Sequence, residues 1–467
     1  MLWFRQYYLG CLSHASYLVG DTTTGRAAVV DPQRDIDQYL RDAEAEGLRI
    51  EWVIETHFHA DFLSGHLELA AATGARIAYG EAAAGRTEFP IEALAHGQRL
   101  ELGEVVLEVR ATPGHTPESI SVVVWEHADD PVPYGVCTGD TLFIGDVGRP
   151  DLLVSVGHTP DDLGRMLYRS LHEQLLTLPD ATRVFPAHGA GSACGKNLST
   201  ETESTIGLQR ATNYALQPMT EAEFVAVVTE GQPAAPPYFL FAATRNREQR
   251  ALLRDQGITP MTLDEVLAAQ RDGAVVLDTR DQTMFAAGHL VGSVSVGLDG
   301  RFAEYAGNVL TSETPIVLVG EPDTEGEART RLARIGFDRV VGALDDYVAA
   351  FMDHPEVVAR ASRLTADELA ERRAALPGLQ VVDVRNPGEV QGTGTVPGAA
   401  TIPLPQLTAR FGELDPSVPT VVYCAGGYRS SIAASALRAR GFTDVSDLLG
   451  GIGAWSASGR DLAGTGA

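Results

Sequence analysis

The stretch 56–66, THFHADFLSGH, spaces two histidines and an aspartate in the way that metal ligands are spaced. His57 and His59 flank one residue, and Asp61 follows two positions later. Imidazole nitrogens and carboxylate oxygens are common ligands of Zn²⁺ and Fe²⁺ in proteins. Phe62 takes the next position, where a phenyl ring cannot coordinate an ion. The stretch therefore indicates a metal site and argues against a second metal ligand directly after Asp61.

Three further residues of the same chemical types follow at long spacing. They are His115 in TPGHTPES, Asp140 in CTGDTLF and His188 in FPAHG. A single histidine is most often structural, but the joint pattern is hard to obtain by chance. We predict that these residues share one metal site. Spacing alone allows iron or zinc, and it equally allows His57, His59 and His115 to bind zinc together.

A second kind of chemistry is indicated by the stretch 421–431, VVYCAGGYRSS. An apolar run ends at Cys424, and two glycines allow the backbone N–H groups of the following loop to turn inward around one point. A helix expected from about Ser430 adds positive potential at its N-terminus. A thiolate or persulfide at Cys424 would be stabilised there, and Arg429 is placed to meet an anion such as thiosulfate.

These residues need rigid elements to position them, and apolar runs supply candidates. Each metal-ligand candidate directly follows such a run, as expected when a sheet presents ligands on its loops. The stretch 65–75 predicts a helix that ends at Gly74. The expected strands of this part of the chain lie within residues 27–32, 51–56, 105–116, 119–126 and 184–189.

The second half of the chain contains an internal repeat, after a proline-rich break at 231–238 that we interpret as a linker. The repeat has a domain-sized offset of about one hundred residues. Both copies alternate strands with helices, which predicts parallel sheets. Gly320 stands in the first copy where the second has Cys424, so the first copy is expected to be catalytically inactive. The matching pairs are 275–280 with 380–385, 315–320 with 419–424, and 332–340 with 437–445.

The metal-ligand motifs resemble the metallo-β-lactamase fold, an αββα sandwich. Taken with GDTLFIGDVGRPDL and PAHGAGSACGK, they look like the persulfide dioxygenases, in particular the bacterial form fused to rhodanese domains. The Cys424 loop resembles the rhodanese active-site loop, and VVDVRNPGEV and VPGAATIP match further rhodanese signatures. The implied fold class is α/β, with a metallo-β-lactamase domain at 1–235, an inactive rhodanese-like domain at 255–355 and an active one at 362–467.

The resemblance implies one Fe(II) per chain, held by His57, His115 and Asp140. Two histidines and one carboxylate leave open positions on ferrous iron for oxygen and substrate. His59, Asp61 and His188 would then orient the ligands or hold a water near the metal.

Three further residues are candidates for handling the substrate. In the resembled family an arginine at the position of Arg149 meets the carboxylate of a glutathione-like thiol, a task that suits a guanidinium fork. Thr116 is expected to help bind the substrate. Cys194 either carries a persulfide between the two sites or is a structural thiol.

The activity implied by the resemblance is oxidation of a low-molecular-weight thiol persulfide by O₂ to sulfite and thiol. Rhodanese transfer through Cys424 would then form or use thiosulfate. A zinc thioesterase of the glyoxalase type with an appended sulfurtransferase is the first alternative, and Phe62 argues against it. A non-catalytic sulfur carrier or persulfide sensor is the second. The sequence does not identify the thiol.

Composition limits the partners and the compartment. The 467 residues carry a formal net charge of −26, which argues against affinity for nucleic acid or anionic membranes. Four scattered cysteines suggest a reducing cytoplasm and no disulfide framework. No apolar run is long enough to span a membrane, and the first ten residues lack the layout of a signal peptide. We expect a cytoplasmic homo-oligomer.

Overall fold

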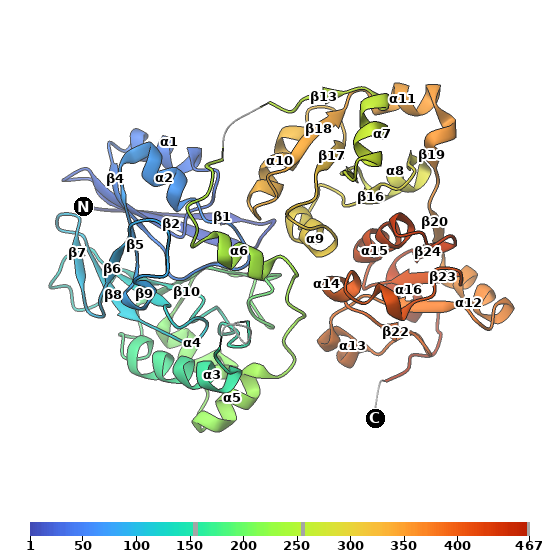
Figure 1. Cartoon of the computed structure of the whole chain (residues 1–467). Helices are drawn as coiled ribbons and strands as arrows, with labels where there is room; N and C mark the ends of the chain where they lie inside the picture. The colour runs from blue at the N-terminus through green and yellow to red at the C-terminus, as the bar shows by residue number, and fades with distance from the viewer. Residues whose placement is uncertain (153–156, 254–256, 465–467) are drawn as a thin grey trace. The chain divides into compact units, whose positions relative to one another are not determined.

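The computed structural model describes residues 1–152, 157–253 and 257–464, and the chain divides into two compact units (Figure 1). The first unit is Met1–Gln232 with Phe239–Arg254, and the second is Pro233–Tyr238 with Asp255–Ala467. Residues 255, 256 and 465–467, at the ends of the expected second and third domains, lie outside the described residues. Within the described ranges, no helix is both long and apolar enough to cross a membrane.

The first unit contains two six-stranded sheets. The first sheet has the order β1-β2-β3-β4-β5-β6, and its strands are Leu2–Leu9, His14–Asp21, Arg26–Val30, Arg49–Ile54, Arg76–Gly80 and Glu92–Leu94. The second has the order β12-β11-β10-β9-β8-β7, and β7 to β12 are Arg99–Glu101, Val106–Ala111, Ile120–Trp125, Gly135–Gly139, Arg183–Pro186 and Ser204–Thr205.

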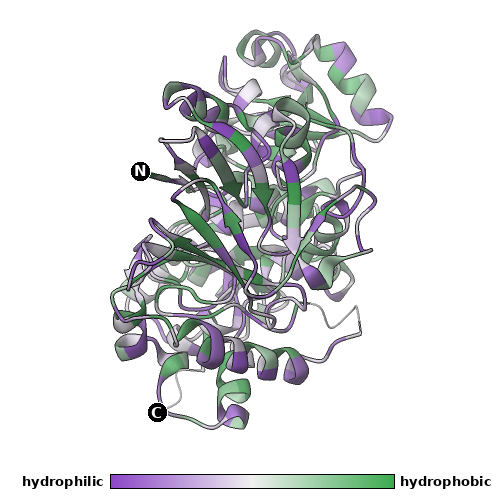
Figure 2. Ribbon diagram, turned by 90° about the vertical axis from the view of Figure 1, so that its left-hand side faces the viewer, coloured by the Kyte–Doolittle hydropathy of each residue, from purple (hydrophilic) through white to green (hydrophobic). Residues whose placement is uncertain are grey.

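Alternating side chains of the buried strands face opposite layers. In β3, Ala28 and Val30 join a core cluster that also contains Leu107 and Val122 of the second sheet. Val29 instead packs in the cluster beneath a helix on the outer face of the first sheet. Strands buried on both faces are expected to be apolar throughout, and Figure 2 shows hydrophobic residues along much of the strands.

Helices cover the outer faces of both sheets. On the first sheet these are α1 (Asp37–Ala45) and α2 (His66–Thr73), and on the second α3 (Pro160–Arg169), α4 (Ile206–Thr212) and α5 (Glu221–Thr229). The unit is therefore an αββα sandwich, as predicted. The predicted helix end at Gly74 is confirmed, because this residue caps α2 with a positive φ of 74°.

The sandwich brings the predicted ligand loops to one edge of the second sheet. β8 and β10 both pair antiparallel with β9, and β11 pairs parallel with β10, so the carboxyl ends of β8, β10 and β11 point the same way. His115, Asp140 and His188 follow these three ends. The loop that carries His57 follows β4 in the facing sheet.

The second unit contains two five-stranded parallel sheets, with orders β13-β18-β17-β14-β16 and β20-β24-β23-β21-β22. Numbered in chain order within each sheet, both orders run first, fifth, fourth, second, third, which confirms the sequence repeat as a repeat of topology. The strands are Pro260–Met261, Val275–Asp278, Val294–Ser295, Ile316–Val319 and Val340–Leu344, then Ser362–Leu364, Gln380–Asp383, Ala400–Thr401, Thr420–Tyr423 and Val445–Leu448.

Helices alternate with these strands, as the α/β prediction requires. In the first copy they are α7 (Leu263–Arg271), α8 (Gln282–Ala287), α9 (Phe302–Val309), α10 (Glu325–Ala333) and α11 (Tyr347–Asp353). In the second copy they are α12 (Ala366–Ala375), α13 (Pro387–Thr393), α14 (Leu404–Leu407), α15 (Tyr428–Ala439) and α16 (Gly451–Ala457).

Candidate metal centre and sulfur-transfer site

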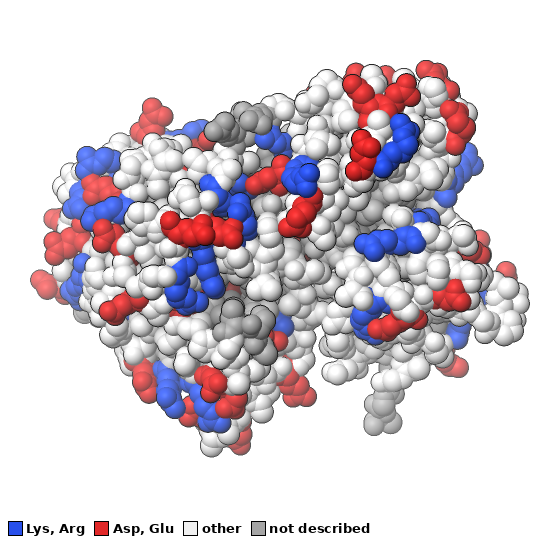
Figure 3. Space-filling model, in the orientation of Figure 1, with Lys and Arg blue, Asp and Glu red and all other residues white. Residues whose placement is uncertain are grey.

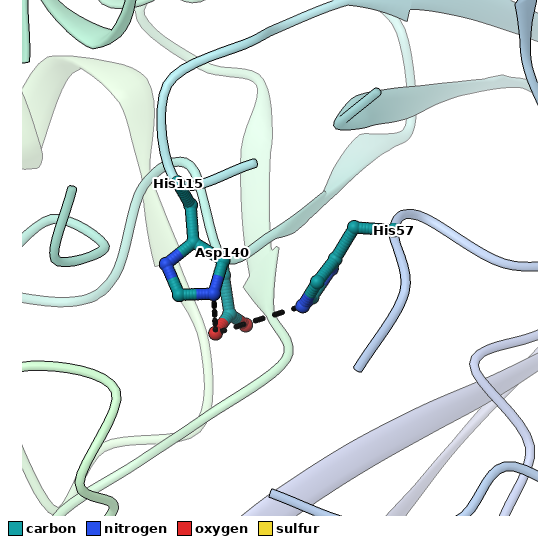
Figure 4. Close-up of side chains that lie close together, drawn as sticks. All are labelled: His57, His115 and Asp140. Carbon is teal, nitrogen blue, oxygen red and sulfur yellow. Dashed lines mark ion pairs between the residues drawn. The ribbon is translucent and has the colours of Figure 1, made fainter. Parts of the chain in front are cut away.

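The first unit brings His57, His115 and Asp140 together in its interior (Figure 4). His115 Nε2 lies 3.4 Å from Asp140 Oδ2, and His57 Nε2 lies 3.9 Å from the same oxygen. Each of the three residues is at most 2% exposed. Two imidazoles and a carboxylate therefore converge on one point that the solvent scarcely reaches.

Hydrogen bonds behind the rings fix which nitrogen each histidine presents. A ligating histidine usually engages its second nitrogen with a backbone or side-chain oxygen, which sets the tautomer and the ring orientation. Three histidines follow this rule with their Nδ1 atoms and leave Nε2 facing Asp140. The contacts are His57 with Thr56 Oγ1 at 3.0 Å, His115 with the Arg149 carbonyl at 2.9 Å, and His188 with the Ser13 carbonyl at 3.1 Å.

Several of the polar atoms at this point make no hydrogen bond in the part of the chain that the structure describes. Among the described residues, no hydrogen bond reaches His57 Nε2, His188 Nε2 or either carboxylate oxygen of Asp140. An unsatisfied buried polar atom costs about 1–3 kcal/mol. A bound cation would satisfy these atoms together, so the residues fit a metal ion.

Burial sets the protonation states that a metal would meet. It lowers the pKa of His57 and of His188, and it lowers the pKa of His115 to about 4. Neutral imidazole is the form that binds a metal. Burial, together with the neighbouring Asp61 carboxylate, also raises the pKa of Asp140 to about 6.

His59, Asp61 and His188 form a second donor group beside the first. His188 Nε2 lies 3.4 Å from Asp61 Oδ2 and 3.4 Å from Asp140 Oδ1, so it links the two groups. These residues therefore line the same interior space as the predicted ligands. The expected orienting role for them stays a prediction.

His59 differs from the other histidines in its surroundings. Its Nε2 lies 3.0 Å from Asp31 Oδ1 and 3.4 Å from Glu55 Oε2. Burial acts to lower the pKa of His59, but the two carboxylates outweigh it and raise that pKa well above the usual value. Sequence reasoning missed Asp31 and Glu55, although Asp31 directly follows β3 just as the predicted ligands follow their strands.

Phe62, next to Asp61, packs its ring against two histidine rings in a tilted arrangement. Its ring centroid lies 4.0 Å from that of His14 and 4.4 Å from that of His59, and the residue is 1% exposed. His14, at the start of β2, was not identified from the sequence because it lies outside any motif. The ring thus occupies space beside the second donor group.

Arg149 and Thr116 are both buried and already make contacts within the protein. The Arg149 guanidinium donates to both carboxylate oxygens of Asp151 at 2.7 Å and to the Ala193 carbonyl at 3.0 Å. A substrate carboxylate would have to compete with Asp151 for this fork. Thr116 Oγ1 lies 2.7 Å from Ser119 Oγ.

Cys194 lies beside the metal-ligand candidates. Its sulfur belongs to a donor group with Asp140 and His188, whose ligand atoms are all within 4.8 Å of one another. Burial, with the nearby carboxylates, raises the pKa of the Cys194 thiol well above its usual value. The thiol is therefore protonated when no cation is bound.

The sulfur-transfer loop lies between β23 and α15 in the second unit. The Gly427 N–H donates to Cys424 Sγ at 3.1 Å, and Ser430 Oγ lies 3.6 Å from that sulfur. Gly427 has a φ of 105°, a conformation that other residues rarely adopt. α15 begins at Tyr428, two residues before the expected start. The backbone therefore directs an N–H group at the sulfur, as the loop sequence predicts.

Arg429 forms a bidentate ion pair with Glu389 of α13, with N–O distances of 2.7 and 2.6 Å. Tyr428 Oη donates to the carbonyls of Gly297 and Asp299, which belong to the other rhodanese-like copy. The copy that has Gly320 in place of the cysteine thus contacts one side of the Cys424 loop.

Fold and site together define a metallo-β-lactamase domain joined to a tandem of rhodanese folds. The sequence matches the metallo-beta-lactamase superfamily over residues 9–188 and the rhodanese-like domain over residues 262–353 and 365–458. The chain belongs to the metallo-beta-lactamase superfamily, as a homologue of the persulfide dioxygenases that carries two rhodanese-like domains.

Two relatives and one solved structure show what the chain is similar to. The mitochondrial persulfide dioxygenase ETHE1 of Bos taurus is 31% identical over 235 residues, which cover 50% of this chain and 82% of that protein. A hydroxyacylglutathione hydrolase of Polaromonas sp. is 33% identical over 37% of this chain and 61% of its own length. A solved metallo-beta-lactamase structure from Staphylococcus aureus subsp. aureus COL has a TM-score of 0.66 and 34% identity, covering 73% of this chain and 98% of that chain. These relationships imply a metal-binding site and support an enzyme of sulfur metabolism.

Proposed function

We propose that the protein is a non-haem iron persulfide dioxygenase coupled to a thiosulfate sulfurtransferase. The first reaction takes a persulfide R–S–SH, O₂ and water to R–SH, sulfite and two protons. The observation that carries this proposal is the buried set of His57, His115 and Asp140, in which His57 Nε2 and both Asp140 oxygens make no hydrogen bond to a described residue.

His57, His115 and Asp140 would hold one ferrous ion, which supplies open positions for O₂ and a sulfur anion. The neutral imidazoles present Nε2, and the Asp140 carboxylate balances part of the charge. We assign His59, Asp61 and His188 to orienting this set and holding a water beside it. Asp61 and His188 are also placed to take up protons released in the reaction.

Arg149 and Thr116 are assigned to the substrate. Arg149 holds His115 through its own carbonyl, and its guanidinium could receive a substrate carboxylate in exchange for Asp151. Cys194, beside Asp140, is assigned as an acceptor that could carry a sulfane sulfur out of the metal site.

At the second site, Cys424 attacks the sulfane sulfur of thiosulfate. A new S–S bond forms on the cysteine while the bond to sulfite breaks, and sulfite leaves with the electron pair. The Gly427 N–H, which donates to Cys424 Sγ, would stabilise the thiolate that makes this attack. Arg429 attracts the anionic donor, and the reverse direction would form thiosulfate from sulfite.

The remaining assignments concern organisation and partners. We propose domains at 1–235, 255–355 and 362–467, with residues 239–254 packing in the first unit and the middle domain inactive because Gly320 replaces the cysteine. We further propose a cytoplasmic homo-oligomer that acts on small sulfur compounds and binds neither nucleic acid nor membranes. Figure 3 shows acidic and basic side chains interspersed on the face drawn. Neither this mixture nor the net charge of −26 supports nucleic-acid binding.

One observation favours a second candidate function. His59, Asp61 and His188 form a donor group of their own beside the first, which would suit a two-metal zinc thioesterase. Phe62 speaks against it, because an aromatic ring occupies the position next to Asp61.

Oxygen uptake tests the proposal against both alternatives. Iron-loaded protein should consume O₂ when glutathione persulfide is added, and sulfite should accumulate with it. Zinc-loaded protein that hydrolyses a glutathione thioester, while iron-loaded protein takes up no O₂, would establish the thioesterase instead. Absence of both activities would favour a carrier or sensor.

A further inference from the structure

We propose that Asn246 positions the metal loop, residues 57–64, from a segment beyond the superfamily match at 9–188. This inference rests on the metal centre of the proposed function. The segment consists of α6 (Phe239–Arg245) and residues 246–253, which follow it. It comes after the proline-rich stretch and belongs to the first unit.

The Asn246 side chain makes three hydrogen bonds to the backbone of the metal loop. Its Nδ2 donates to the carbonyls of His59 and Phe62, both at 2.8 Å, and its Oδ1 accepts from the Ser64 N–H at 2.9 Å. The residue is 1% exposed. A carboxamide has two N–H donors and one carbonyl acceptor, so this amide matches the three backbone groups in both kind and number.

The loop needs such support because it is irregular. Apart from an isolated bridge between Gln33 and Ser64, it has no helix or strand between the end of β4 and the start of α2. It nevertheless carries His57, His59 and Asp61. The two carbonyls that Asn246 holds flank Asp61, so a shift in this contact would move the donor atoms directly.

The same segment also holds the start of α2, where the loop ends. The Arg250 guanidinium donates to the Ser64 carbonyl and pairs with both oxygens of Glu68, at 2.6 and 2.9 Å. Arg34 Nε and the Leu253 N–H donate to the same carboxylate at 3.1 and 3.0 Å. Residues 246–253 therefore fix both the middle and the end of the metal loop.

The Asn246→Asp substitution tests this role with almost no change in size. Aspartate keeps an acceptor for the Ser64 N–H but turns an oxygen toward the two carbonyls that Nδ2 now serves. The oxygens repel each other, and the carbonyls lose their partners. The loop should shift so that His57 and Asp61 no longer present their donor atoms in the same geometry.

The experiment uses the full-length protein with Co²⁺ as the probe. Chelator competition gives the affinity, and the visible spectrum of bound Co²⁺ reports the ligand geometry. Loss of a contact that orients ligands typically costs 10–100-fold in metal affinity, so N246D should bind Co²⁺ at least about tenfold more weakly and show shifted bands. Val228→Ala is the control, because Val228 is buried in the core on the outer face of the other sheet. It should lower the melting temperature and leave both metal readouts unchanged.

The outcomes separate this inference from the metal centre itself. Wild-type protein that binds no Co²⁺ would overturn the metal centre. Wild-type and N246D proteins with equal affinity and spectrum would overturn the role of Asn246 alone. If N246D does not fold, N246S is measured in the same way. Failure of both variants to fold would identify Asn246 as a structural residue and also overturn the proposal.

Discussion

Replacement of Glu68 by glutamine tests the ion cluster behind the metal loop. Glu68 is 4% exposed, and its carboxylate is the shared partner of two buried guanidinium groups. Arg250 binds it through both oxygens, and Arg34 adds a third contact. Glutamine has nearly the same shape but no charge, and its NH₂ group would face the guanidinium N–H groups of Arg250.

The expected loss of stability follows from burial. Removal of one partner from a buried ion pair costs roughly 3–5 kcal/mol, because the remaining charge has no partner. Glutamine retains one acceptor oxygen, so we expect a loss of about 3 kcal/mol. A change of that size lowers the melting temperature of a unit of this length by roughly 6–12 °C.

Calorimetry and urea unfolding of the full-length protein measure this loss, with Glu203→Gln as control. Glu203 pairs with Arg183 on the surface, where such pairs contribute about 1 kcal/mol or less. Burial acts to raise the pKa of Glu68, but Arg250 and Arg34 outweigh it and hold that pKa below its usual 4.5. The extra stability of the wild type over E68Q should therefore be present above pH 4.5, the usual pKa. It should disappear as the pH falls through the lowered pKa of Glu68. A loss no larger than that of E203Q would refute the reasoning.

Three further predictions concern the two sites. Cys424→Ser should abolish sulfur transfer from thiosulfate to cyanide and leave oxygen uptake largely intact; equal loss of both activities would contradict separate sites. Asp140→Ala should abolish metal binding and oxygen uptake but leave thiosulfate:cyanide transfer unchanged, and retained uptake would refute the ligand assignment. The pKa of Asp140 is about 6 without metal, so protons compete with the metal for this carboxylate below that pH. Metal affinity measured by chelator competition should therefore fall about tenfold per pH unit there. An affinity that stays constant between roughly pH 4 and pH 6 would contradict the assignment of Asp140 as a ligand.

The fold could be predicted because its signals are local. Apolar runs marked five of the twelve strands of the first unit, namely β3, β4, β8, β9 and β11, and Gly74 marked the end of α2 through a conformation that favours glycine. The repeat offset predicted two equivalent sheets, and the structure gives both the same strand order. Strand ends indicated one metal site, but the choice of His57, His115 and Asp140 as its ligands came from the resemblance, because spacing equally allowed His57, His59 and His115.

The residues that sequence reasoning missed depend on tertiary contacts. Asn246 lies 187 positions from His59, whose carbonyl it holds, and an asparagine just after a short helix carries no signal of its own. His14 packs on Phe62 from another strand, and Glu55 meets His59 only through the turn of the loop. Arg149 was expected to meet a substrate carboxylate, and sequence reasoning did not identify Asp151, two positions away, as the partner of its guanidinium.

The metal content of full-length protein purified from iron-replete cells tests the central claim most directly. The account predicts one iron per chain, lost together with oxygen uptake in Asp140→Ala. One zinc and no iron, or two metal ions per chain, would contradict it.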